Sequence, residues 1–270
     1  MSTDVAVINE EEKLAMLRDL GMEDDKPKYL PQLKINYKDE NEADVKLTKG
    51  LFYVGGSDDE PVYAKEVDFR PLSMQFQYMD YDNAVSKMRN RTISVNRLMD
   101  ETRDMLGTIR CGKPTSKILK TLPADEQKKY ESIKCYRQVR GLVSYTGKTA
   151  TGETKTIENL PVLLSLKGSN FSPFEDAVVK ALPRGRKLYE YWIHLSNTKV
   201  KGKTTYWVID YKPDFSTAVA LDAPTFETMR GFKALSDSEN AYIEGKYIEA
   251  LSGDALDAEA MDGLEYDMAE

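Results

Sequence analysis

Residues 134–166 read KCYRQVRGLVSYTGKTATGETKTIENLPVLLSL, and this stretch decides the fold class. Two apolar runs, residues 135–145 and 160–166, flank a polar segment from Gly147 to Glu158 that is rich in threonine and glycine. Apolar runs of β-forming residues on both sides of a Gly-containing polar segment are typical of a β-hairpin. The stretch therefore predicts two antiparallel strands.

The segments that follow predict a helix and then a second hairpin. Apolar residues recur at near-helical spacing in residues 171–182, and the sequence Pro-Arg-Gly then ends the pattern. Residues 189–195 and 205–211 are apolar runs joined by the polar segment 197–203. The order hairpin, helix, hairpin suits an OB-fold-like Greek-key barrel.

Upstream segments add strands to this architecture. Short or alternating apolar segments predict strands at residues 33–37, 50–54, 62–64, 72–81 and 89–98. Residues 125–133 and 226–251 have helical composition. The expected fold class is mainly β (α+β), an OB-fold-like barrel with N-terminal β additions and a few helices.

Charge divides the chain into three parts. Residues 1–25 hold eight acids and two bases, and residues 252–270 hold seven acids and no base. Since the net charge of the whole chain is −7, residues 26–251 carry +6. We expect an acidic N-terminal arm at 1–25, a single β-rich OB-like binding domain at 26–251 and a disordered acidic tail at 252–270.

The excess of positive charge is concentrated in residues 85–140, which hold 14 bases against six acids. Such a cluster is typical of a surface that binds a polyanion, although a solvated basic surface has the same composition. The cluster favours a nucleic-acid partner without establishing one.

Several other classes of protein are not indicated by the sequence. The N-terminus has no basic segment followed by an apolar one, and no apolar run is long enough to cross a membrane. The two cysteines, Cys111 and Cys135, form no disulfide framework, which favours a reducing compartment. We expect a cytoplasmic protein, in the host cytoplasm if the source is viral, without membrane partners.

No catalytic constellation is recognisable, so we expect no enzyme and no cofactor. The single histidine, His194, lies in a predicted strand, and general acid–base chemistry has no second histidine to use. The segment from Gly141 to Lys148 has five residues between its glycines where a phosphate-binding loop has four. Cys111, Cys135 and His194 lack the fourth ligand and the close cysteine pairing of a structural zinc site, so no metal is expected.

The residues expected to bind nucleic acid combine cations, which contact phosphates, with aromatic rings, on which bases stack. They are Lys87, Arg89, Arg91, Arg97, Tyr136, Arg137, Arg140, Tyr145, Lys148, Tyr189, Tyr191, Trp192, Lys199, Lys201, Lys203, Tyr206 and Trp207. A spacing of two predicts that Lys87, Arg89, Arg91 and Arg97 share one face of a strand. About half of the aromatic rings are expected in the core instead.

The C-terminal tail is a second candidate site, for partner proteins. It combines acids with spaced apolar residues at Asp262, Leu264, Glu265, Tyr266, Asp267 and Met268. Such a tail can occupy the basic groove of its own domain, and it can present apolar anchors to a partner when nucleic acid displaces it. A solubilising tail without a partner has the same composition.

Three segments together resemble phage-encoded single-stranded-DNA-binding proteins of the OB-fold type. They are residues 135–145 (CYRQVRGLVSY), residues 158–168 (ENLPVLLSLKG) followed by 171–182, and the acidic, aromatic-containing tail. The resemblance covers about half of the chain. It implies sequence-tolerant binding of single strands during DNA replication, recombination or repair, and a tail that recruits a polymerase, helicase-primase or recombinase.

Other interpretations stay open. A β-rich virion or assembly protein would share the architecture without binding nucleic acid, and an enzyme of nucleic-acid metabolism would need a carboxylate–metal site that the sequence does not offer. The choice between DNA and RNA, and self-association into a homo-oligomer, are also open. Steeply salt-dependent binding to oligothymidine would favour the single-strand interpretation.

Overall fold

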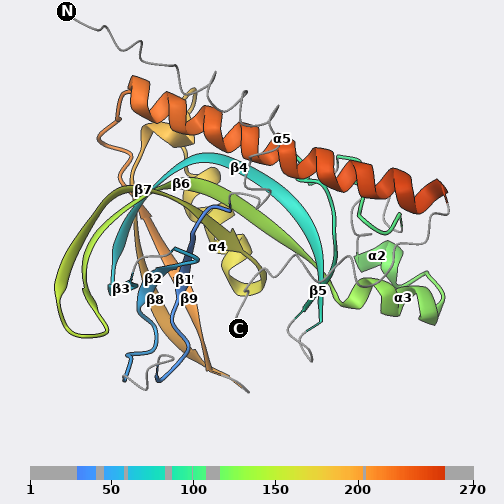
Figure 1. Ribbon diagram of the computed structural model, residues 1–270, viewed down its shortest axis with the longest axis horizontal. Helices are drawn as coiled ribbons and strands as arrows, with labels where there is room; N and C mark the ends of the chain where they lie inside the picture. The colour runs from blue at the N-terminus through green and yellow to red at the C-terminus, as the bar shows by residue number, and fades with distance from the viewer. Residues whose placement is uncertain are drawn as a thin grey trace, which may run out of the picture.

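The computed structural model describes residues 29–40, 46–57, 60–82, 87–98, 100–107, 116–202 and 205–252 of the 270-residue chain. These residues form a mainly β structure in which nine strands share one curled sheet (Figure 1). The strands are β1 (Gln32–Ile35), β2 (Phe52–Gly55), β3 (Val62–Tyr63), β4 (Val67–Asp82), β5 (Lys87–Arg91), β6 (Ile133–Thr149), β7 (Thr154–Leu166), β8 (Ile193–Lys201) and β9 (Thr205–Pro213). The helices are α2 (Ser116–Leu119), α3 (Ala124–Glu131), α4 (Phe171–Phe174) and α5 (Ala223–Ser252), with single 3-10 turns at Gly168–Asn170 and Leu188–Glu190.

Both predicted hairpins are confirmed, and β4 joins them. The sheet runs in the order β2-β1-β7-β6-β4-β8-β9, with β3 paired to β6 and β5 to β4. β6 and β7 form the first antiparallel hairpin, and β8 and β9 form the second. β4 pairs with β6 along most of its length and with β8 through its first three residues. The sheet thus curls so that its two hairpins face each other across α4.

The curl is sharpest where β4 passes from one hairpin to the other. The β4–β6 register shifts between Pro71 and Ser73, opposite Gly141. A Cβ atom on Gly141 would lie 2.3 Å from the carbonyl oxygen of Arg70 and 2.7 Å from the ring of Phe69. Only glycine therefore allows the two strands to approach at this bend, as bulges and glycines commonly do in strongly curved sheets.

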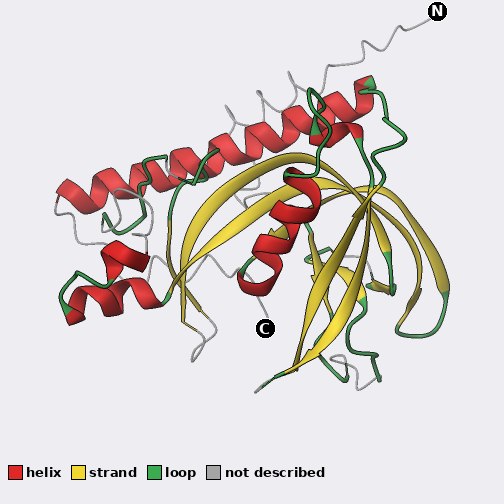
Figure 2. Ribbon diagram, turned by 180° about the vertical axis from the view of Figure 1, so that it is seen from behind, coloured by secondary structure: helices red, strands yellow, loops and turns green. Residues whose placement is uncertain are grey.

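The core fills the inside of the curl. Phe52, Phe69, Val139 and Leu195 are fully buried there together with Phe174, which α4 inserts between the hairpins. Figure 2 shows α4 beneath the arch of β4 and β6, on the side away from α5. The 12-residue helix predicted at 171–182 is in fact one α-helical turn followed by a π-helical turn at Glu175–Val179.

α5 crosses the outer side of the arch as one continuous helix of 30 residues (Figure 1). The prediction of a helix at 226–251 is confirmed. Near its N-terminal end, Phe232 packs against Leu72 and Leu142 of the sheet, with Tyr189 and Trp192 beside them. Further along α5, the contact with the sheet is made by polar side chains. Several of the predicted site residues take part in this contact and are buried by it.

Three local predictions are corrected by the structure. The strand predicted at 89–98 ends at Arg91, which leaves Arg97 outside β5. The polar segment from Gly147 to Glu158 is strand except for the tight turn between β6 and β7. Lys199 and Lys201 belong to β8, since the second hairpin is longer than its apolar residues indicated. The two predicted termini, 1–25 and most of 252–270, lie outside the described residues.

Candidate nucleic-acid interface

An open cavity of about 740 Å³ lies between the two hairpins and the segment that joins β4 to β6. One wall comes from the end of β4, from β5 and from α3, and the other from β9 and from Tyr37, which follows β1. The 3-10 turn Gly168–Asn170, which precedes α4, also lines the cavity. The lining residues are Tyr37, Tyr81, Arg89, Lys128, Ser132, Lys134, Tyr136, Lys167, Gly168, Ser169, Asn170, Tyr206 and Trp207. We call this space the outer cavity.

The charged side chains that line the outer cavity are all basic. Lys128 on α3, Lys134 on β6 and Lys167 after β7 are solvent-exposed. Arg89 on β5 is half exposed and forms ion pairs with Asp80 at 3.1 Å and Asp82 at 3.5 Å. Such exposed ion pairs are weak and are readily exchanged for a phosphate. The cavity therefore presents four cations from four separate elements.

Aromatic rings stand between these cations. The ring of Tyr37 contacts the ring of Trp207 edge-on, with centroids 5.1 Å apart. Lys167 Nζ lies 5.2 Å from the ring centroid of Tyr136 and donates a hydrogen bond of 3.1 Å to its hydroxyl group. Lys199, just outside the lining, places its Nζ 5.6 Å from the centroid of the Trp207 ring. Two rings at the cavity thus each have a cation beside them, and cations and rings are combined in the same way in sites that bind single strands.

The position of Trp207 depends on a glycine far away in the sequence. Gly50 has a positive φ of 82°, and a Cβ atom there would lie 2.2 Å from Trp207 Nε1. Asn197 Nδ2 donates a hydrogen bond of 2.8 Å to the carbonyl oxygen of Gly50, which fixes this turn against β8. The indole is buried on the glycine side, so it forms a rigid wall of the cavity.

Arg137 does not belong to this interface, although it was predicted there. Its side chain is 1% exposed and pairs with Glu175 Oε2 at 2.7 Å. The guanidinium lies within 6 Å of the ring centroids of Phe76, Phe171 and Phe174. It thus joins β6 to the α4 segment inside the core, where a phosphate cannot reach it.

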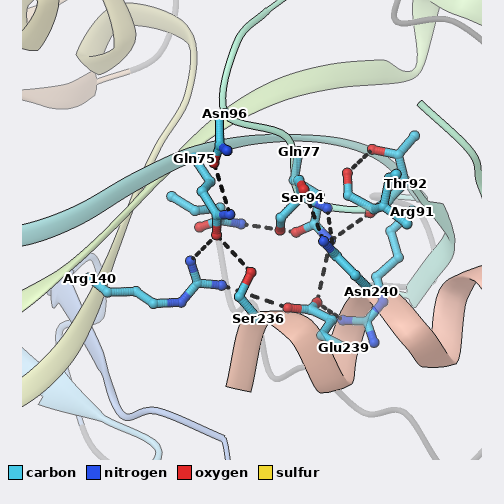
Figure 3. A network of polar contacts seen from close by, with 12 residues as sticks. Gln75, Gln77, Arg91, Thr92, Ser94, Asn96, Arg140, Ser236, Glu239 and Asn240 are labelled. Atoms are coloured by element: carbon cyan, nitrogen blue, oxygen red, sulfur yellow. Dashed lines mark hydrogen bonds and ion pairs between the residues drawn. The ribbon is translucent and has the colours of Figure 1, made fainter. Parts of the chain in front are cut away.

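Arg91 and Arg140 are also buried, beneath α5. Figure 3 shows both arginines directed toward Glu239 of α5, at 2.8 Å from Arg91 and 3.8 Å from Arg140. Arg140 also donates to Gln75 Oε1 at 2.9 Å, and Ser236 Oγ donates to the same oxygen at 2.7 Å. Further along α5, Asn240 exchanges two hydrogen bonds with the backbone of Ser94. These arginines therefore hold α5 against the sheet.

The predicted aromatic residues also fall into two sets, one that borders the outer cavity and one that lies elsewhere. Tyr136 and Trp207 are buried but border the outer cavity, and Tyr206 is half exposed there. Tyr145 lies in the core, where its hydroxyl group donates to the carbonyl oxygen of Val62 and burial raises its pKa to about 12. The other three lie on the α5 side or between β8 and the loop after β9, and they are Tyr189, Tyr191 and Trp192.

The remaining predicted cations are exposed but do not line the outer cavity. Lys87 begins β5, Arg97 follows it, Lys148 lies near the β6–β7 turn and Lys201 near the end of β8. Lys203 and the tail residues Asp262, Leu264, Glu265, Tyr266, Asp267 and Met268 lie outside the described residues. Arg89, Tyr136, Tyr206 and Trp207 are thus the predicted residues that the structure brings together.

Sequence reasoning missed most of the lining. Lys128 and Lys134 were counted in the basic segment but were not selected, because one lies in a helix and the other precedes the apolar run. Tyr37, Tyr81 and Lys167 each lie at or just beyond the end of a strand. A search for basic and aromatic residues at strand ends, where loops carry binding sites, would have found them.

The side chains that first suggested metal or acid–base chemistry lie away from the outer cavity. His194 Nδ1 lies 2.9 Å from Asp68 Oδ1, and its Nε2 lies 3.4 Å from Glu66 Oε2, at the outer edge of β4 and β8. Burial raises the pKa of the Cys135 thiol to about 11, which keeps it protonated and unreactive near neutral pH. Cys111 lies outside the described residues.

Within the described part of the chain, no helix combines the length and apolar character needed to cross a bilayer. The chain matches no protein-family model, and it has no significant match among curated proteins or solved structures.

Proposed function

We propose that this protein binds single-stranded DNA without strong sequence preference, through the outer cavity. The observation that carries the proposal is the lining itself, which combines four cations and five aromatic rings without an acidic side chain. Cations that follow the phosphates and rings that accept stacked bases are the two requirements of such binding. Neither requirement depends on base identity, so the affinity is expected to tolerate sequence changes.

The strand order supports an OB-fold as the basis of this site. β4, β6, β7, β8 and β9 follow one another as the five strands of that barrel do, with α4 between the third and the fourth, and β4 pairs with both β6 and β8. In OB-folds the loop between strands 1 and 2 and the loop between strands 4 and 5 flank the bound oligonucleotide. Here the first of these connections contributes Arg89 and Lys128, and the second hairpin contributes Tyr206 and Trp207.

We test this proposal by removing charge inside and outside the outer cavity. Lys128→Ala with Lys134→Ala is expected to weaken binding to labelled oligothymidine about tenfold at low salt, and to reduce the slope of log affinity against log salt by about two. The control is Lys148→Ala with Lys201→Ala, which removes the same charge from exposed positions outside the lining. Fluorescence anisotropy at several salt concentrations measures both.

Two outcomes would contradict the proposal. Equal losses in the two double variants would mean that the cavity is not the interface. If the intact protein fails to bind any single strand at micromolar concentration and low salt, and assembles with itself instead, the alternative of a virion or assembly protein is favoured.

The acidic tail extends the proposal to regulation and to partners in replication, recombination or repair. Residues 252–270 carry a charge of −7, opposite to the charge of the cavity lining. A tail of this charge is expected to compete with DNA for the same cations. A chain that ends at Leu251 should therefore bind oligothymidine several-fold more tightly than the full chain at low salt, and the difference should vanish at high salt. Equal affinities at low salt would exclude the competition.

A further inference from the structure

The outer cavity continues inward into a second, smaller space of about 230 Å³, which we call the inner pocket. It lies between β1, the end of β7 and β9, and its deep end reaches the apolar side chains of Phe52, Leu166 and Ile209. Five residues line both spaces and thus form the neck between them. They are Tyr37, Tyr81, Tyr136, Lys167 and Asn170.

The neck has a composition unlike that of the outer cavity. It contains three tyrosine rings, one lysine and one carboxamide, whereas the three cations Arg89, Lys128 and Lys134 line only the outer cavity. Lys34 and Lys167 also line the inner pocket, but its deep end is apolar, at Phe52, Leu166 and Ile209. A phosphate is therefore better stabilised by the four cations of the outer space than at that apolar end. A planar base has apolar faces and a polar edge, so it fits the neck, which offers aromatic rings and a carboxamide.

Asn170 supplies the polar group in the neck, and its orientation is fixed. Its Oδ1 accepts a hydrogen bond of 2.8 Å from the backbone N–H of Ile209. Because a backbone N–H can only donate, the oxygen must face β9, and the Nδ2 amide group must point the other way. This Nδ2 has no hydrogen-bond partner among the described residues, although Asn170 is half buried. Since Asn170 lines both spaces and its oxygen is engaged by β9, the Nδ2 group is the donor that it can offer to a ligand in the neck.

We propose that one unstacked base of the bound strand enters the neck and accepts a hydrogen bond from Asn170 Nδ2. The inference rests on the proposed function and makes it more specific, since it assigns phosphates to the outer cavity and one base to the inner pocket. Carbonyl oxygens such as O2 and O4 of thymine are acceptors of the required kind.

The test compares oligothymidine with an abasic strand of the same length. The intact protein should bind the abasic strand at least about tenfold more weakly, since stacking and one hydrogen bond are lost. In Asn170→Asp the retained oxygen can still accept from Ile209, but the donor is replaced by an anionic acceptor. This variant should reduce the ratio of the two affinities about threefold to tenfold.

The matched control is Ser169→Asp, which adds the same charge at an exposed position that lines only the outer cavity. It should weaken both strands alike and leave their ratio unchanged. Equal ratios in the two variants would overturn the inference while the proposed function stands. Equal affinities of the intact protein for the two strands would overturn the inference and would also contradict the base stacking of the proposed function. If no strand binds at all, it is the proposed function that fails.

A second measurement uses only the intact protein, so its result does not depend on whether Asn170→Asp folds. Single abasic substitutions are moved along the shortest oligothymidine that binds tightly to the intact protein. One position, or two adjacent ones, should cost most of the lost affinity. A uniform small loss at every position would contradict a dedicated base pocket.

Discussion

Arg89 and Arg91 lie two residues apart on β5, yet they have opposite surroundings. Arg89 lines the outer cavity and is half exposed, whereas Arg91 is 4% exposed and pairs with Glu239. The register between β4 and β5 shifts at this point, because Tyr81 pairs with Met88 while Asp80 pairs with Asn90. Arg89 is therefore the extra residue of a β-bulge, and a bulge redirects the side chain that it contains.

The same contrast holds for the basic residues as a whole. Lys128, Lys134 and Lys167 are exposed around the cavity, while Arg137 and Arg140 are buried beside carboxylates of the same chain. The amino-acid composition does not distinguish these exposed lysines from the buried arginines. The difference is made by Glu175 and Glu239, which neutralise the buried arginines, whereas the lysines around the cavity stay exposed to solvent.

The largest effect is expected when the ion pairs of the buried arginines are broken. Glu239→Ala removes a carboxylate that serves two buried arginines, so it should lower the free energy of unfolding by about 3 kcal/mol. The affinity for oligothymidine, measured under conditions where the variant is folded, should stay within about twofold of the original, since the cavity lining is unchanged. Chemical denaturation and anisotropy measure the two quantities.

The control for that variant is Glu227→Ala on the same helix. Glu227 forms an exposed ion pair with Arg230, so its loss should cost at most about 1 kcal/mol. If the two variants lose the same stability, the network in Figure 3 does not hold α5 in place.

A second variant perturbs the wall of the outer cavity. Gly50→Ala places a methyl group against the Trp207 indole at a backbone φ of 82°, so it should destabilise the protein by about 2 kcal/mol and weaken binding as the indole shifts. Gly56→Ala is the matched control, because its φ is 78° but its Cβ meets no atom within 4 Å. That control should cost about 1 kcal/mol and leave binding unchanged. Equal effects would mean that the glycine serves only its own turn.

The smallest effect concerns a position between two cavity residues. Cys135 lies between Lys134 and Tyr136 on β6, but burial raises its thiol pKa to about 11. In a Cys111→Ser variant at pH 8, the folded protein should react with a maleimide at least about tenfold more slowly than the unfolded protein. The rate should keep rising with pH beyond 9, where an ordinary thiol has levelled off. A plateau near pH 9 would show that the thiol is open to solvent.

Local patterns predicted the elements that local patterns can specify. The two runs at residues 135–145 and 160–166, with a polar, Gly-containing segment between them, predicted the β6–β7 hairpin, and the helical composition of 226–251 predicted α5. The site was predicted less well, because only Arg89, Tyr136, Tyr206 and Trp207 among the selected residues line the cavity.

The reason lies in sequence separation. Whether Arg91 faces solvent depends on Glu239, 148 residues away, and the Trp207 wall depends on Gly50. Neither partner can be inferred from the residues around these positions. The bulge at Arg89 also has no signal in the sequence, since lysine, methionine, arginine and asparagine occupy β5 without a glycine that would mark it.

The distance between Arg91 and Glu239 also has a consequence for synthesis on the ribosome. The chain is made from its N-terminus, so β4, β5 and β6 are complete long before the carboxylate that neutralises Arg91 and Arg140 exists. Until then, burying these arginines is unfavourable and they remain hydrated. Completion of the sheet is thus coupled to the emergence of the last helix, and long-range pairings of this kind fold slowly. A chain without α5 would therefore lack both the cover of the outer sheet face and the carboxylate of Glu239 that pairs with Arg91 and Arg140.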